Sequence, residues 1–220
     1  MRTRIKLCGF RSLETVQAAC QAGADAIGFV FYPQSPRYID PVYAKGLVQY
    51  LGAWQTPVAL FVNPEPIQVH EVLRYIPHAV LQFHGEETPE LCESFSRPYI
   101  KAIRMRLDID LKEESKRYSC AQALLLDSWS HAYGGTGHTF DWSLLPKAGQ
   151  LSQPLVLSGG LDVSNVAQAI AHFKPYGVDV SSGIESERGI KNSPKIFEFC
   201  KAVYMADAAS IEPQQEQNHE

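Results

Sequence analysis

Short apolar segments alternate with helix-like segments along nearly all of the 220-residue chain. The apolar segments are rich in Val, Ile, Leu and Phe and predict buried strands, whereas the segments between them have helix-starting residues and helical periodicity. The eight predicted strands are 4–8, 24–31, 57–63, 79–84, 99–105, 121–127, 154–158 and 177–181. The predicted helices are 13–22, 42–51, 67–76, 91–95, 107–118, 141–147, 162–172 and 193–205.

This repeat predicts an α/β chain that forms a single (β/α)8 TIM barrel. Dividing 220 residues among eight units leaves about 27 for each, which suits a compact barrel. No linker interrupts the alternation, so we expect the barrel over residues 1–205 and a polar, disordered tail at 206–220. A doubly wound open sheet shares the alternation, but the first strand–helix turn, residues 8–12, lacks the GxGxxG pattern of such folds.

The net charge and the cysteine spacing indicate which binding partners and which cellular compartment to expect. The formal net charge is −4, so nucleic acid and an anionic membrane, which need a basic face, are not expected. The five cysteines show no CxxC spacing, and no apolar stretch has the length of a signal peptide or a membrane span. We therefore expect a cytoplasmic protein without disulfides or a zinc site. An anionic ligand would need a locally positive site.

Two glycine-rich turns, Ser158–Gly159–Gly160 and Ser181–Ser182–Gly183, follow the seventh and eighth predicted strands. In (β/α)8 barrels these loops commonly hold a phosphate group. Glycine backbone N–H groups can converge on the anion, and a following helix, here expected from Asp162, adds its dipole. Either turn alone is explained as a chain reversal, but two turns in these positions favour a phosphate site.

Cys8 ends the first strand and Asp127 ends the sixth, so both lie at the end of the barrel where catalytic groups occur. A lone cysteine is more often a small buried apolar residue, and a lone aspartate can cap a loop. Side-chain alternation puts Lys6 on the same inward face as Cys8, one layer deeper. We predict that Lys6 pairs with Asp179 of the eighth strand, across the closure of the barrel.

Three further segments reach the same end of the barrel. His84 ends the fourth strand and is either a site residue or a hydrogen-bonded structural histidine. Arg37 lies in a loop stiffened by Pro33 and Pro36, and its forked guanidinium suits a carboxylate. The glycine-rich segment 134–137 lies in a long loop after the sixth strand, either a hinged lid or simply a flexible connection.

Several strings of residues are more specific than any single position. They lie at 6–9, 22–31, 35–38, 60–63, 81–85, 126–128, 134–137, 140–142, 157–161 and 179–185. Together they resemble the phosphoribosylanthranilate isomerase family, in order, from Arg4 to about Met205. Phe10 and Arg11 depart from the aliphatic residue and threonine more usual in that family, which affects the first loop rather than the chemistry.

The resemblance implies a barrel enzyme of tryptophan biosynthesis that uses neither metal nor cofactor. Its reaction is the Amadori rearrangement of N-(5-phosphoribosyl)anthranilate to 1-(2-carboxyphenylamino)-1-deoxyribulose 5-phosphate. Carried onto this sequence, Cys8 matches the general base, Asp127 the general acid and Arg37 the residue facing the anthranilate carboxylate. The other implied substrate-binding positions are Gln82, His84, Gly135, Ser158, Gly159, Gly160, Asp179, Ser181, Ser182 and Gly183. The expected ligand is a small molecule with phosphate and carboxylate groups, and the expected assembly is a monomer or a homodimer.

The chemistry requires two groups with unusual protonation. An ordinary cysteine is only about 3% thiolate at pH 7, and an ordinary aspartic acid is protonated less than about once in a thousand. We therefore predict that Cys8 and Asp127 share about one proton as a coupled pair. The alternatives are another phosphosugar barrel, such as an indole-glycerol-phosphate synthase or a ribulose-phosphate epimerase, and a silent barrel that only binds a phosphorylated metabolite. The synthase's lysine motif and the epimerase's metal-binding histidines are absent from the sequence.

Overall fold

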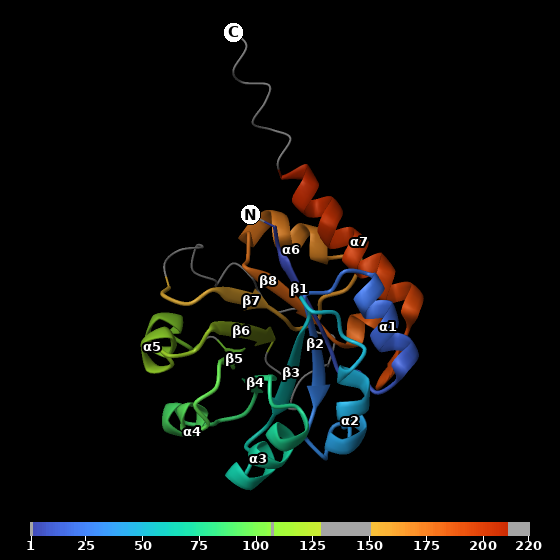
Figure 1. Cartoon of the computed structure of the whole chain (residues 1–220). Helices are drawn as coiled ribbons and strands as arrows, with labels where there is room; N and C mark the ends of the chain where they lie inside the picture. Colours follow the sequence, from blue (N-terminus) through green and yellow to red (C-terminus); the bar gives the residue numbers. More distant parts are fainter. Residues whose placement is uncertain (1, 107, 129–150, 211–220) are drawn as a thin grey trace.

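Eight parallel strands close into a barrel in which each strand pairs with its neighbour in the sequence and β8 pairs with β1 (Figure 1). The computed structural model describes residues 2–106, 108–128 and 151–210. The strands are β1 (Arg4–Cys8), β2 (Ala26–Val30), β3 (Thr56–Phe61), β4 (Val80–Phe83), β5 (Tyr99–Met105), β6 (Ala123–Ser128), β7 (Leu155–Leu157) and β8 (Gly177–Val180). The predicted (β/α)8 barrel is confirmed.

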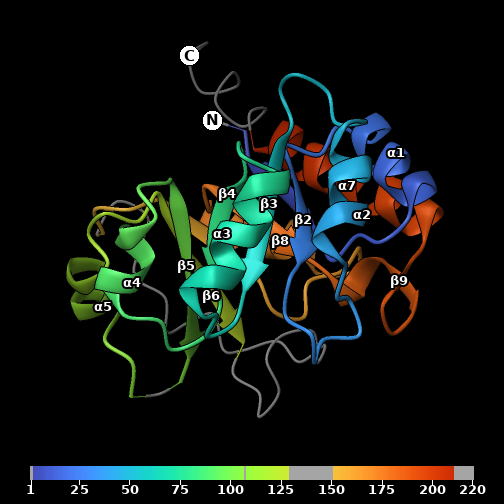
Figure 2. The same ribbon diagram turned by 60° about the horizontal axis from the view of Figure 1, so that its bottom comes forward.

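Helices surround the strands on the outside of the barrel (Figures 1 and 2). They are α1 (Leu13–Gln21), α2 (Pro41–Val48), α3 (Pro66–Tyr75), α4 (Pro89–Ser94), α5 (Leu111–Arg117), α6 (Val166–Phe173) and α7 (Ser193–Ala209). Within the described ranges, no helix is both long and apolar enough to cross a membrane. The predicted helix at 141–147 and the glycine-rich segment 134–137 lie outside the described residues.

Strand β1 shows how the barrel sorts its side chains between two layers. Ile5 and Leu7 are fully buried in the apolar layer shared with the helices, where each contributes roughly 1.5–3 kcal/mol by leaving water. Lys6 and Cys8 alternate with them and point into the barrel. Cys8 packs there in a smaller apolar cluster that includes Leu60 of β3. The predicted orientation of the two inward residues is therefore confirmed.

Side-chain caps move two helix starts away from the predicted positions. Helix α5 begins at Leu111, because the Asp110 carboxylate accepts the backbone N–H of Lys112 at 2.8 Å. Helix α6 begins at Val166, and the expected start at Asp162 is wrong. There the Asp162 carboxylate accepts the backbone N–H of Ser164, and a turn precedes the helix. The α6 dipole therefore starts four residues later than predicted.

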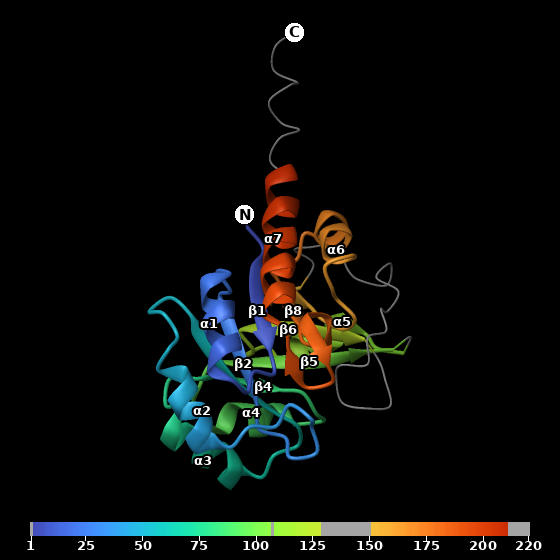
Figure 3. The same ribbon diagram turned by 90° about the vertical axis from the view of Figure 1, so that its right-hand side faces the viewer.

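Helix α7 extends four residues beyond its predicted end at Met205, into the segment expected to be a tail. It packs between α1 and α6, as Figure 3 shows. The carboxylate of Asp207 accepts both the backbone N–H and the hydroxyl of Thr3, each at 2.7 Å. This contact joins the last turns of α7 to the start of β1, so residues 206–209 belong to the barrel. Residues 211–220 lie outside the described part of the chain.

The last strand continues into a small hairpin that no periodic pattern predicts. A short 3₁₀ helix, η2 (Ser182–Ile184), follows β8 and leads to the antiparallel pair β9 (Glu185–Glu187) and β10 (Ile190–Lys191). Figure 2 shows β9 to the right of the barrel strands, below α1 and α7. The hairpin brings two buried charged residues, Glu185 and Lys191, to the end of the barrel where the strands finish.

Candidate active site

A cavity lies at the carboxyl-terminal end of the barrel strands. Most of the residues singled out in the sequence line it: Cys8, Arg37, His84, Asp127, Ser158, Gly159, Gly160, Asp179, Ser181 and Ser182. They come from six strands or the loops that follow them, so the barrel gathers positions that are up to 174 residues apart in the chain (182 − 8). Residues predicted at strand ends and in the loops that follow them therefore form one continuous site.

Two of the predicted substrate-binding residues, Gln82 and Gly183, are not among the residues that line the cavity. The Gln82 side chain is fully buried and is bonded to His84. Gly183 packs against the preceding glycine turn, where a Cβ atom would come within 2.1 Å of the Leu161 carbonyl oxygen. Both residues thus support others that line the cavity. Gly135 lies outside the described residues.

Cys8 occupies a tight, charged environment at the end of β1. It pairs in register with Gly28 of β2, where an added Cβ would lie 2.6 Å from the Cys8 sulfur. One layer below, the Lys6 ammonium lies 2.7 Å from the Asp179 carboxylate, and both side chains are almost completely buried. The predicted pairing across the barrel closure is confirmed.

The protonation of Cys8 reflects opposing influences. Burial raises the pKa of the Cys8 thiol and outweighs the positive charges of Lys6 and Lys191, which lower it. The lysine below the thiol therefore offsets the cost of forming a thiolate only in part. The free protein holds Cys8 mainly as the thiol at neutral pH.

Within the described residues, the hydrogen-bond partner of the Asp127 carboxylate is His84, and Cys8 is not bonded to it. The Nε2 atom of His84 lies 2.9 Å from the Asp127 carboxylate, and its Nδ1 atom lies 3.1 Å from the Gln82 amide nitrogen. With the amide as donor to Nδ1, the imidazole proton is on Nε2 and points at Asp127. Gln82, His84 and Asp127 form a chain of three buried side chains.

The strand end that carries His84 is anchored by a buried ion pair. Lys101 of β5 donates to the Gly85 carbonyl at 2.6 Å and to the Glu87 carboxylate at 3.0 Å. Glu87 in turn accepts the backbone N–H groups of Gly85 and Asn63. Because these bonds fix the turn immediately after His84, the imidazole is held at the cavity wall.

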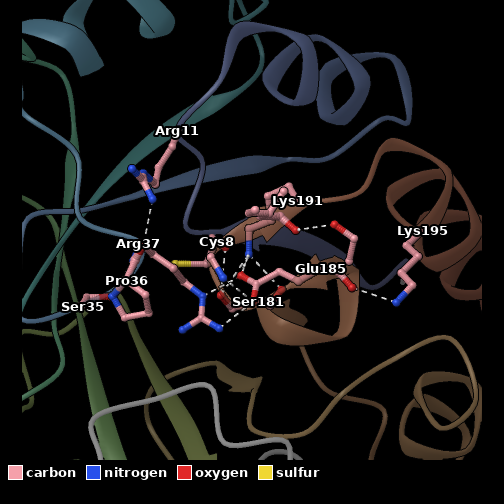
Figure 4. A network of polar contacts seen from close by, with 12 residues as sticks. Cys8, Arg11, Ser35, Pro36, Arg37, Ser181, Glu185, Lys191 and Lys195 are labelled. Carbon is pink, nitrogen blue, oxygen red and sulfur yellow. Dashed lines mark hydrogen bonds and ion pairs between the residues drawn. The ribbon is translucent and has the colours of Figure 1, made fainter.

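Arg37 is held by a carboxylate that sequence reasoning did not assign (Figure 4). Its Nε and Nη2 atoms donate to the two oxygens of Glu185, at 2.7 and 2.8 Å. The same carboxylate accepts a bond of 2.7 Å from Lys191. Although burial raises the pKa of Glu185, the bonds from Arg37 and Lys191 outweigh it and lower the pKa to about 2. The cluster is therefore charged at neutral pH.

The glycine turn after β7 has the backbone expected of an anion site. Gly159 and Gly160 have φ values of 82° and 68°, a region that glycine adopts without strain. The turn is fixed by Asn165, whose amide donates to the Gly160 carbonyl at 2.8 Å. Ser181, in the turn after β8, donates its hydroxyl to the Cys8 carbonyl at 3.1 Å. Its proton is thus already engaged, which leaves Ser182 as the better hydroxyl donor to a ligand.

The family description "N-(5'phosphoribosyl)anthranilate (PRA) isomerase" matches residues 5–202. This chain belongs to the PRA isomerase family. The N-(5'-phosphoribosyl)anthranilate isomerase of Leptothrix cholodnii is 48% identical over 211 residues, which cover 96% of this chain and 95% of that protein.

Solved PRA isomerase structures share the fold. The enzyme from Thermotoga maritima is 40% identical with a TM-score of 0.84, and the match covers 92% of this chain and 99% of that one. A second PRA isomerase structure, 35% identical with a TM-score of 0.77 and the same coverage, is a complex with reduced 1-(o-carboxyphenylamino)-1-deoxyribulose 5-phosphate. These relatives span the whole barrel, so the similarity is not confined to the site.

Sequence reasoning missed three residues at this PRA isomerase site. Gly28 lies in the string 22–31, but its place opposite Cys8 depends on strand register, which is a property of the folded sheet. Glu185 and Lys191 are contributed by a hairpin of three-residue and two-residue strands, too short to give a periodic signal. The one available signal for Glu185 was its place at the end of the string 179–185.

Proposed function

We propose that this chain isomerises N-(5'-phosphoribosyl)anthranilate to 1-(2-carboxyphenylamino)-1-deoxyribulose 5-phosphate. The observation that carries the proposal is the convergence of Cys8 and Asp127 on one cavity that also has a glycine-turn phosphate site and Arg37. The substrate has a phosphate and a carboxylate, one at each end. Its size and charges match the small-molecule, anionic ligand expected from the sequence.

In the first step, Asp127 acts as general acid. It gives its proton to the ring oxygen of the furanose as the bond between that oxygen and C1 breaks, and the nitrogen lone pair forms the iminium. Asp127 becomes a carboxylate, to which the Nε2–H of His84 donates. His84 is thus a positioning residue in this scheme.

In the second step, Cys8 acts as general base. Its thiolate takes the proton from C2, the C2–H electron pair forms the C1=C2 bond, and the iminium nitrogen recovers its electrons. The resulting enol tautomerises to the C2 ketone as C1 gains a proton. Because the thiol is favoured in the free protein, Cys8 must lose its proton before this step.

The groups that bind the two ends of the substrate orient it in the cavity. The glycine turns after β7 and β8 hold the phosphate through backbone N–H groups, with Ser182 as a hydroxyl donor. The Ser158 hydroxyl donates to the Asp179 carboxylate at 3.4 Å and must turn from it to reach the phosphate. Arg37 faces the carboxylate of the aromatic ring. Asp179, bonded to Lys6 at one oxygen, also lines the cavity.

The test follows the loss of phosphoribosylanthranilate fluorescence with wild type, Cys8→Ala and Asp127→Asn. We expect turnover by wild type and a loss of at least about a hundredfold in both variants. Normal turnover by both variants would refute the assigned roles. No turnover by wild type would favour the silent barrel that only binds a phosphorylated metabolite.

The assembly we propose is the homodimer. The Thermotoga maritima relative is described as dimeric. In this chain, Trp54 is 95% exposed on the loop between α2 and β3, and Tyr50 on the same loop is half-exposed. Together with the dimeric relative, these two exposed side chains support our choice of this loop as the contact surface. Light scattering on wild type and Trp54→Ser decides between dimer and monomer.

A further inference from the structure

The geometry of the Arg37–Glu185 pair raises the question of how Arg37 attracts a second carboxylate. The Nε and Nη2 atoms of Arg37 both donate to Glu185, Nη1 is not bonded to that carboxylate, and both side chains are buried. A bidentate arginine–carboxylate pair has no net charge. Such a pair fixes the guanidinium firmly but offers little attraction to a second carboxylate arriving from the substrate.

Lys191 changes this balance. Its ammonium has three acceptors, at 2.7 Å from the Glu185 carboxylate, 2.9 Å from the Ser181 carbonyl and 3.1 Å from the Ser181 hydroxyl. Three acceptors match the three N–H groups of a charged lysine. Two positive groups and one carboxylate give Arg37, Glu185 and Lys191, hereafter the charge triad, a net charge of +1.

We propose that Lys191 is a positioning residue for recognition of the substrate carboxylate: by sharing Glu185, it lets that residue fix Arg37 while the charge triad stays positive. The inference rests on the proposed function, because it concerns the carboxylate end of that substrate. Lys191 acts through Glu185 and Arg37, and the cavity lining includes Arg37 but not Lys191.

The same lysine connects the triad to the strand end that holds Cys8. Ser181 accepts from Lys191 and donates to the Cys8 carbonyl, as Figure 4 shows. Loss of Lys191 could therefore disturb the site generally as well as weaken carboxylate binding. A test must separate these two effects, and a comparison of ligands with and without the carboxylate does so.

The groups around Lys191 make the effect depend on pH. It faces Glu185 of β9, Arg37 from the loop after β2, Cys8 of β1 and the ring of Phe10 at 5.9 Å. Burial lowers the pKa of Lys191 to about 8, against the attraction of Glu185. Above pH 8 the free protein loses this charge and the triad becomes neutral. Affinity for a carboxylate should then fall.

The experiment measures binding of reduced 1-(o-carboxyphenylamino)-1-deoxyribulose 5-phosphate and of the same compound without its carboxylate. We expect Lys191→Met to weaken binding of the first at least about tenfold more than binding of the second. The matched control is Lys195→Met. Lys195 lies nearby but donates only to the Glu185 backbone carbonyl, so this variant should leave the ratio of the two affinities unchanged. An equal loss for both compounds in Lys191→Met would overturn the inference.

Wild type supplies a second readout that does not depend on the folding of a variant. Between pH 6.5 and 9.5, the affinity ratio of the two compounds should fall above pH 8, where the phosphate group no longer titrates. A ratio that stays flat across this range counts against Lys191. If wild type binds neither compound, the proposed function itself fails and the inference fails with it. Binding with a flat ratio leaves the function standing and removes only the inference.

Discussion

His84 donates from Nε2 to the Asp127 carboxylate across 2.9 Å, and the Gln82 amide lies against the other side of the imidazole. The general acid therefore has a defined orientation before the substrate arrives. Misplacement of a catalytic group by about 1 Å can cost a factor of about a hundred in rate. Orientation of Asp127 through His84 is thus a testable part of the mechanism.

We expect His84→Gln to lower kcat about tenfold to a hundredfold with little change in KM, because the proton donor loses its fixed position. Gln82→Leu keeps the imidazole and removes only its outer partner, so its kcat should fall less. Steady-state kinetics on both variants, with thermal unfolding as the folding control, measure this order. A larger loss in Gln82→Leu than in His84→Gln would contradict the chain from Gln82 to Asp127.

The close contact between Gly28 and Cys8 predicts that a larger residue at position 28 displaces the general base. An added Cβ would lie 2.6 Å from the Cys8 sulfur and 3.1 Å from the Cys8 Cα, so Gly28→Ala must displace the thiol or the strand. We expect a kcat loss of about tenfold or more. Gly46→Ala is the control, since a Cβ there meets no atom within 4 Å and alanine favours the helix. Equal activity of the two variants would show that the thiol position tolerates a shift.

The extent to which the sequence predicts this protein differs between fold and site. The spacing of apolar residues predicted the barrel strands and helices, because each strand and helix must bury one or both of its faces and this burial fixes where apolar residues occur. Helix ends were less predictable, since they depend on single contacts such as Asp110 with Lys112 or Asp207 with Thr3. The Thr3 contact joins residues 204 apart in the chain, which no local pattern reveals.

Within the site, predictable residues are those that end a strand. Cys8 and Asp127 follow from strand alternation and the polarity of barrel sites, and the Lys6–Asp179 pair follows from closure of the sheet. Glu185 and Lys191 could not be derived in this way, because their role depends on a hairpin that packs onto Arg37. Residues that hold the site residues in place are determined by tertiary contacts, whereas residues at strand ends follow from the alternation of strands and helices along the chain.

The Lys6–Asp179 ion pair predicts linked effects on stability and on the thiol. Lys6→Met leaves Asp179 buried without its cation, and we expect a loss of about 3–5 kcal/mol in the free energy of unfolding. Because Lys6 lowers the pKa of Cys8, its removal should also move the pH profile of Cys8 alkylation to higher pH. Urea denaturation and iodoacetamide kinetics measure the two effects. An unmoved alkylation profile in a folded variant would show that Lys6 does not act on the thiol.

Alkylation also tests the predicted sharing of a proton between Cys8 and Asp127. The charged groups acting most strongly on the pKa of Cys8 are Lys6, Asp179 and Lys191. This order of influence speaks against the coupled pair predicted from the sequence, and we expect Asp127→Asn to move the alkylation profile less than Lys6→Met does. The opposite order would favour direct coupling of the thiol and the general acid.

Glu185 predicts how stability depends on pH. Its pKa is about 2 in the folded protein against an ordinary value of 4.5. The folded state therefore binds fewer protons than the unfolded state between these values. Its contribution is complete above pH 4.5 and is lost as pH falls toward 2. At about 1.4 kcal/mol for each pKa unit, the whole effect is about 3 kcal/mol.

Other carboxylates also titrate in this range, so the informative quantity is the difference in unfolding free energy between wild type and Glu185→Gln. We expect this difference to shrink steadily from pH 4.5 to 3, because glutamine does not titrate. In wild type Lys191, with a pKa of about 8, stays charged throughout this window. Because the Glu185 carboxylate raises the pKa of Lys191, the variant has a lower Lys191 pKa, and the comparison is therefore read below pH 4.5. Urea denaturation at half-unit pH steps measures the difference. A constant difference down to pH 3 would mean that Arg37 and Lys191 do not stabilise the Glu185 carboxylate in the folded protein.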